Sequence, residues 1–160
     1  MHPPDFTEEQ KRTADEAWAT RNAIFEALPK AAALIKLYGK VPTFHDGEVQ
    51  TVHLTLNGSS RLTTRIGFPD IFGPGHVFVT FDFIPIDVNL EGFSPQNVIF
   101  ELWLRPAVAQ PDHPAKGIGI EPGDIEIELE PIFGIGGSII ARNISVSWSK
   151  RPSGSRKMTL

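Results

Sequence analysis

The spacing of apolar side chains changes once along the chain. Over residues 7–39 apolar residues recur every three to four positions, the period of a helix, and from Glu48 onward they recur every second position, the period of a strand. The pattern predicts an N-terminal helical arm over 7–39 and an antiparallel β domain over 48–149. A disordered start at residues 1–6 and a basic tail at residues 150–160 complete the expected organisation.

The arm carries local signals for where its helices begin and end. Thr7 and Gln10 match a capping box, in which each side chain satisfies a backbone N–H of the first turn. Pro29 lacks a backbone N–H, so it either kinks the helix or opens a second one, and Gly39 is a C-terminal stop. We therefore expect a kinked helix or a helix pair. Its apolar stripe is formed by Ala14, Ala17, Trp18, Ile24, Phe25 and Leu28.

The remainder of the chain gives at least six strand-like runs, separated by turns rich in glycine and proline. No helical crossover lies between them, which predicts a mainly β fold, an antiparallel β-sandwich or jelly roll, with a β-barrel as the alternative. In the first hairpin, side-chain parity favours a three-residue loop at 57–59 that places Leu54 opposite Leu62. Arg142 falls on the apolar face of the last strand, so we expect a bulge there or a partner for its charge.

Composition limits the chemistry and the compartment. The 160 residues include no cysteine, which excludes disulfides and thiolate metal sites. The N-terminus lacks a standard signal peptide and no apolar run is long enough to span a membrane, so we expect a soluble protein, cytoplasmic or virion-like. Residues 41–149 hold thirteen acidic and five basic residues, whereas the tail holds four bases and no acid. Such spread charges are more typical of a solvated terminus than of a nucleic-acid site.

Candidate catalytic residues are few. The long irregular stretch at residues 105–123 contains Asp112 and His113, and His45 precedes the first strand, so these three could form a site. No His-x-His pair or four-apart pair is present, so we expect no metal and no cofactor. The outward carboxylates of the fifth strand are expected to stay solvated or to meet Arg61 and Arg65 across strands or subunits; they are Glu126, Glu128 and Glu130.

Surfaces for a partner are better represented than catalytic groups. The sequence is rich in phenylalanine, and the loop around Ile71 and Phe72 is too apolar to lie comfortably in water. We expect partner contacts from the arm, this loop and the tail, through Trp18, Phe25, Ile71, Phe72, Arg151, Arg156 and Lys157. The sequence thus favours a non-catalytic structural or assembly module that forms a homo-oligomer or docks on a protein partner. A small-molecule or lipid-binding sandwich is the first alternative, and an enzyme with its site at the 105–123 loop is the second.

Overall fold

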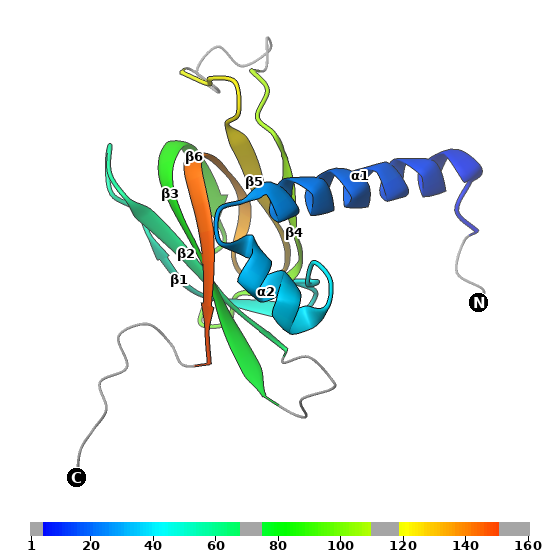
Figure 1. Cartoon of the computed structure of the whole chain (residues 1–160), viewed down its shortest axis with the longest axis horizontal. Coiled ribbons are helices and arrows are strands. Elements are labelled where there is room, and N and C mark those ends of the chain that lie inside the picture. The colour runs from blue at the N-terminus through cyan, green and yellow to red at the C-terminus, as the bar shows by residue number, and fades with distance from the viewer. Residues whose placement is uncertain (1–4, 68–74, 110–118, 151–160) are drawn as a thin grey trace.

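The computed structural model describes residues 5–67, 75–109 and 119–150. Within these ranges two helices precede six strands, as Figure 1 shows. The elements are α1 (Glu8–Ala27), α2 (Ala31–Tyr38), β1 (Gly47–His53), β2 (Ser60–Gly67), β3 (His76–Glu91), β4 (Val98–Pro106), β5 (Ile125–Phe133) and β6 (Gly136–Ser149). All six strands belong to one antiparallel sheet, and the prediction of a mainly β, antiparallel fold behind N-terminal helices is confirmed.

Neighbouring strands are hydrogen-bonded in the order β1-β2-β3-β6-β5-β4. The sheet closes on itself because β4 also pairs with β1. The seam between β1 and β4 is short, with Gly47 opposite Ile99 and Glu48 opposite Val98. One further bond, from the Val49 backbone N–H to the Asn97 carbonyl at 2.8 Å, extends it. The seam is therefore much shorter than the eight-residue pairing of β2 with β3.

The arm is a helix pair. Thr7 and Gln10 form the expected capping box at the start of α1. Pro29 is neither a kink nor the first residue of α2; it lies in the turn between the helices, and α2 begins two residues later after Lys30 in the left-handed conformation, φ 67°. Gly39 ends α2 with φ 73°, a conformation that glycine adopts without strain.

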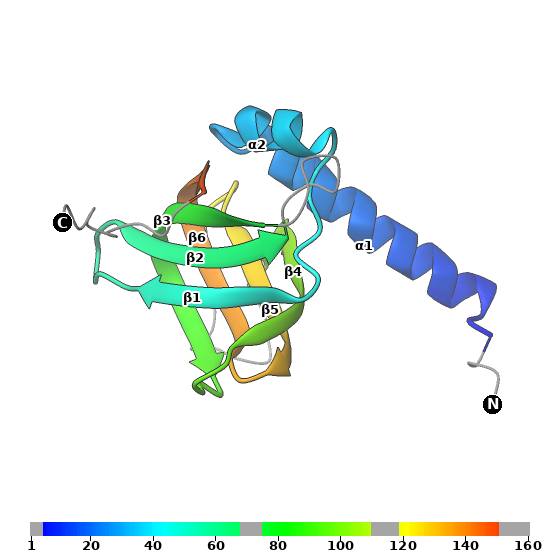
Figure 2. The ribbon, with the colours of Figure 1, turned by 90° about the horizontal axis from the view of Figure 1, so that it is seen from below.

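Only the second half of α1 packs on the sheet. α1 lies against β4 and α2 against β6, where the Val146 backbone N–H donates to the Pro29 carbonyl at 3.1 Å. Phe25, Leu28 and Leu34 are buried with the inward side chains of the strands in one core. The first half of α1 projects beyond the sheet in both views (Figures 1 and 2), and its residues 8–17 are exposed.

The predicted register of the first hairpin is wrong by two residues. Leu62 lies opposite Val52, not Leu54, because β1 ends at His53 and a longer loop reaches β2. A two-residue shift preserves which face each side chain occupies from Thr51 to His53, but a one-residue shift between Val49 and Thr51 reverses the alternation in the first half of β1, where Val49 is buried. Leu54, which was expected to lie opposite Leu62, is in the loop and is exposed, as is Leu56.

The expectations for β5 and β6 differ in outcome. Arg142 has both predicted features: the β3–β6 register shifts beside it, and its guanidinium forms two bonds with the Asp124 carboxylate, at 2.9 and 2.8 Å. Within one copy the outward carboxylates of β5 do not pair with Arg61 and Arg65, since Arg61 pairs with Asp82 and Arg65 with Glu48; a contact across subunits stays a prediction. Among the helices that the structure describes, neither is long and apolar enough to cross a membrane.

Candidate interaction surfaces

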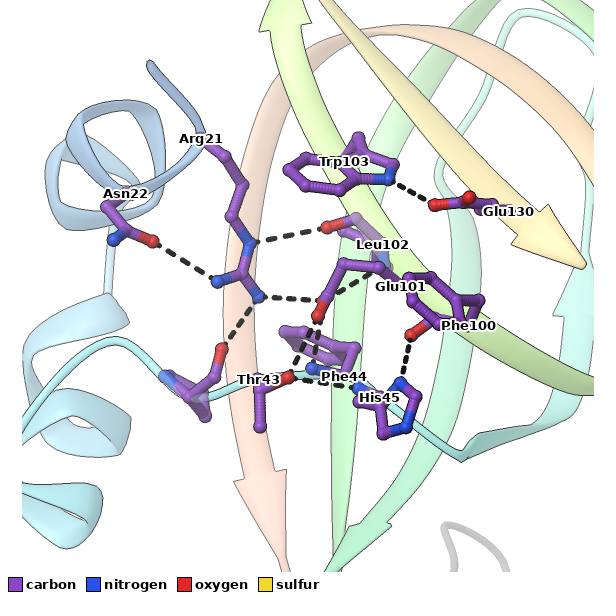
Figure 3. A network of polar contacts seen from close by, with 11 residues as sticks. Arg21, Asn22, Thr43, Phe44, His45, Phe100, Glu101, Leu102, Trp103 and Glu130 are labelled. Atoms are coloured by element: carbon purple, nitrogen blue, oxygen red, sulfur yellow. Dashed lines mark hydrogen bonds and ion pairs between the residues drawn. The ribbon is translucent and has the colours of Figure 1, made fainter. Parts of the chain in front are cut away.

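A buried ion pair joins the arm to the sheet (Figure 3). Arg21 of α1 and Glu101 of β4 are both about 1% exposed, and the Arg21 Nη2 lies 3.2 Å from the Glu101 Oε1. Arg21 also donates from Nη2 to the Pro42 carbonyl at 2.7 Å and from Nε to the Leu102 carbonyl at 3.3 Å. The guanidinium thus holds α1, the segment after α2 and β4 together.

The Glu101 carboxylate is equally well bonded. It accepts from the backbone N–H groups of Phe44 and Leu102, at 2.9 and 3.1 Å, and from the Thr43 hydroxyl at 2.8 Å. Burial lowers the pKa of Arg21 from its ordinary value, and the attraction of Glu101 opposes that shift. Because every bond ties one part of the chain to another, we assign this network a structural role: it fixes where α1 leaves the sheet.

Two tryptophans mark the point where α1 separates from the sheet. The rings of Trp18 and Trp103 meet edge to face with centroids 4.8 Å apart, and the Arg21 guanidinium lies 5.2 Å from the Trp18 ring centroid. The Trp103 Nε1 donates to the Glu130 Oε2 at 2.7 Å (Figure 3). From this contact toward its N-terminus, α1 runs away from the sheet, and a hollow lies between the helix and the sheet.

This hollow, the arm groove, has a volume of about 550 Å³. One wall is α1 and the other is the outer face of β4 and β5. It is lined by Thr13, Glu16, Ala17, Thr20, Trp103, Leu104, Arg105, Glu128 and Glu130. Arg105 donates to Glu128 at 2.7 Å across the two strands. The lining combines an aromatic ring with an excess of carboxylates, a surface suited to a cationic partner.

A second surface lies at the end of the sheet where β4 begins and β5 ends. Four large apolar side chains are exposed there: Phe93 at 65%, Phe133 at 59%, Phe100 at 46% and Ile132 at 39%. We call them the end patch. Phe100 faces outward because the β4–β5 register shifts between Ile99 and Glu101, which moves it out of the inward set that a regular strand predicts. Large apolar side chains exposed at one end of a sheet are candidates for an interaction surface.

The end patch is held by two turns that pack on each other. A Cβ on Gly92 would lie 2.5 Å from the Gly134 carbonyl oxygen, so the two backbones approach closely beside Phe93 and Phe133. The Asn97 side chain bridges the turns, since its Oδ1 accepts from the Ser94 N–H at 3.1 Å and from the Ile135 N–H at 3.0 Å. Phe93 and Phe133 therefore adjoin turns that are fixed to each other.

The structure places the predicted catalytic residues only in part. His45 is exposed; its Nδ1 bonds to the Phe100 carbonyl at 3.0 Å and its Nε2 lies 3.5 Å from the Asp46 carboxylate. Asp112 and His113 lie outside the described residues, so no geometry connects them with His45. Among the described residues, no group of three or more His, Asp or Glu side chains is arranged to hold a metal ion.

The predicted partner-binding residues separate into three cases. Trp18 lies half-buried beside the arm groove. Phe25 is corrected: it is fully buried in the chain's own core, with its ring centroid 6.3 Å from those of Phe44 and Phe81, because α1 packs its second half in cis. The remaining five lie outside the described residues: Ile71, Phe72, Arg151, Arg156 and Lys157.

Sequence reasoning missed the residues that shape these surfaces. Arg21 shares the helical stripe of Trp18 and Phe25, and Glu101 stands inside an apolar strand; charged residues in such positions signal a buried pair. Phe93 and Phe133 each adjoin a glycine in a turn, where an aromatic residue signals a surface function.

Comparison of the chain with family models, curated proteins and solved structures gave no match.

Proposed function

We propose that this chain is a non-catalytic assembly module that self-associates through its end patch. The observation that carries the proposal is the exposure of Phe93, Phe100, Ile132 and Phe133 at the end of the sheet where two turns are bonded to each other. Burying a phenylalanine or isoleucine side chain is worth roughly 1.5–3 kcal/mol, so these three phenylalanines and one isoleucine together favour binding. A rigid base keeps the entropic cost of binding low.

A second copy is the occupant that best fits the charge of the molecule. Residues 41–149 carry eight more acidic than basic residues, so two copies repel each other over much of their surface. The four residues of the end patch are uncharged. Meeting there keeps the acidic surfaces apart and lets both copies use the same residues, as a two-fold interface requires.

The arm groove supports a second candidate, the binding of a small ligand beside Trp103. Its volume suits such a ligand. Three carboxylates and one guanidinium line it, however, and a lipid or another apolar ligand would need an apolar lining. The groove therefore favours a polar, cationic occupant.

The test is the mass of the full chain in solution, measured by sedimentation equilibrium across micromolar to submillimolar concentrations. We expect the wild type to exceed the 17.6 kDa of one chain at the higher concentrations. The double variant Phe93→Ser, Phe133→Ser should weaken association at least tenfold, since two apolar contacts are lost from each copy.

The matched control is Leu56→Ser, which changes a side chain that is 90% exposed in the β1–β2 loop, away from the end patch. It should associate like the wild type, and circular dichroism should show all variants folded. A wild-type chain that stays at one copy throughout, or a patch variant that associates as strongly as the control, would overturn the proposal.

A further inference from the structure

The arm groove has an excess of negative charge at its lining. Glu16, Glu128 and Glu130 face it, against the single base Arg105. Glu128 and Glu130 each bond through Oε2, to Arg105 and to the Trp103 indole, and a carboxylate has capacity for further donors. Glu16 lies 3.9 Å from Arg12 in a pair where both side chains are more than 70% exposed, a contact of little strength. The groove can therefore accept more cationic groups than the described residues supply.

The same chain carries a segment with the opposite character. Residues 151–160 contain Arg151, Arg156 and Lys157 and no acidic residue. Pro152, Gly154 and two serines leave the segment little apolar surface for packing on its own core. Its charge complements the groove. We propose that the arm groove of one copy binds the C-terminal segment, residues 151–160, of a second copy.

Chain length favours a second copy over the same one. The Val146 N–H bonds to the Pro29 carbonyl, so the path from Ser149 back to Val146 and then along α1 from Pro29 to Thr20 measures about 25 Å, at roughly 3.3 Å per strand residue and 1.5 Å per helix residue. Both views show β6 ending on the side away from the projecting half of α1 (Figures 1 and 2). The seven residues from Ser149 to Arg156 span at most about 25 Å when fully extended. Arg156 would thus meet its own groove only with the segment fully extended, whereas the groove of a neighbour requires no such extension.

The proposal rests on the proposed function because both place copies of the chain together, but its contact is separate and its test is direct. A peptide of residues 149–160 is titrated into the full chain, and the indole N–H of Trp103 is followed by NMR. That proton is bonded to Glu130 inside the groove, so a bound cation should shift it. We expect saturable binding that weakens about tenfold between 0.05 and 0.5 M salt, as for contacts between exposed charges.

Two charge-matched variants decide whether the groove is the site. Glu128→Gln with Glu130→Gln should reduce peptide affinity about tenfold. Glu26→Gln with Glu91→Gln removes the same charge from exposed positions outside the groove and should change affinity less than twofold. Equal losses in both pairs would show a response to net charge alone and overturn the proposal, as would absence of binding at millimolar peptide.

Deletion of residues 151–160 distinguishes a contact between two copies from a contact within one copy. The Trp103 indole signal should change with protein concentration in the full chain and lose that dependence in the truncated one. A difference between the two chains that is the same at every concentration would assign the contact to a single copy and contradict the proposal. The patch variant Phe93→Ser, Phe133→Ser should still bind the peptide, so failure of self-association through the end patch is distinguishable from failure of this inference.

Discussion

At the scale of single residues, the buried pair of Arg21 and Glu101 has the largest expected effect on stability. Replacing Arg21 by Met would leave the Glu101 carboxylate buried without a counter-charge and with one hydrogen bond fewer. Breaking a buried pair from one side costs about 3–5 kcal/mol. We expect Arg21→Met to lose that amount in the free energy of unfolding, measured by urea titration and followed by circular dichroism.

The double variant shows whether the pair or the packing is responsible. Arg21→Met with Glu101→Met should recover part of the loss, because no unpaired charge remains buried. Arg12→Met, at a side chain that is 71% exposed, is the control and should stay within about 0.5 kcal/mol of the wild type. A loss at Arg21 no larger than that at Arg12 would contradict the role we assign to the network.

Asp124 gives a residue-scale prediction on pH. The hydrogen bond from Arg142 lowers the pKa of Asp124 below its ordinary value of 3.8, burial opposes the shift, and the Glu121 backbone N–H adds a bond that lowers it further. A carboxyl group whose pKa is lowered by folding stabilises the protein above its unfolded pKa, and that contribution is lost as the pH falls through the folded pKa.

We therefore expect the stability difference between wild type and Asp124→Asn to be constant above about pH 5 and to shrink as the pH falls below 4. Urea titrations of both chains at a series of pH values measure it. Asp87→Asn, at a carboxylate of β3 without the Arg142 contact, is the control for general acid destabilisation. A difference that does not change with acid would show that the ion pair makes no contribution.

At the scale of elements, the periodicity of the sequence predicted those features that interactions between nearby residues determine. The capping box, the helix pair and the partner of Arg142 all follow from spacing or from an unbalanced charge. The β1–β2 register could not be obtained this way, because parity distinguishes odd from even shifts but not one even register from another. The outward position of Phe100 could not be predicted either, because a register shift in β4 leaves no periodic signal.

The two halves of α1 should differ in local stability. The first half lacks buried side chains, and an isolated helix shorter than about 12–15 residues is marginal in water, whereas Arg21 and Phe25 fix the second half to the sheet. We expect backbone amides of residues 12–17 to exchange hydrogen at least a hundredfold faster than those of residues 22–27 in dilute solution. Amide exchange followed by NMR measures this gradient.

Measuring this exchange at several protein concentrations distinguishes the local stability of the helix from contacts with a second copy. If the arm groove is filled by a second copy, exchange at residues 12–17 should slow as protein concentration rises, while residues 22–27 stay unchanged. Equal protection of both halves at the lowest concentration would show that contacts within one copy hold the first half, and it would contradict the division of α1 that exposure indicates.

At the scale of the whole molecule, the two proposed contacts differ in symmetry. The end patch of one copy binds the end patch of another, which limits that contact to two copies. A C-terminal segment in a groove joins two different surfaces, so this contact can repeat from copy to copy. Together they would produce assemblies larger than a dimer, and salt would shorten them because only the groove contact is held by attraction between opposite charges. Both contacts use elements attached to one closed sheet, so they depend on its seam.

Gly47 tests that seam. It pairs with Ile99 across β1 and β4, and a Cβ there would lie 2.7 Å from the Phe44 carbonyl oxygen and 3.1 Å from the Thr64 Cγ2. Gly47→Ala should therefore force the strands apart and cost about 1–3 kcal/mol in the free energy of unfolding. Gly67→Ala is the control, since a Cβ on this other strand glycine meets nothing within 4 Å and should cost less than about 0.5 kcal/mol. The amide of Val49, which bonds to Asn97 across the seam, should exchange faster in Gly47→Ala alone. Equal stability of the two variants would mean that the sheet does not need its seam closed, and that β1 is held by β2 instead.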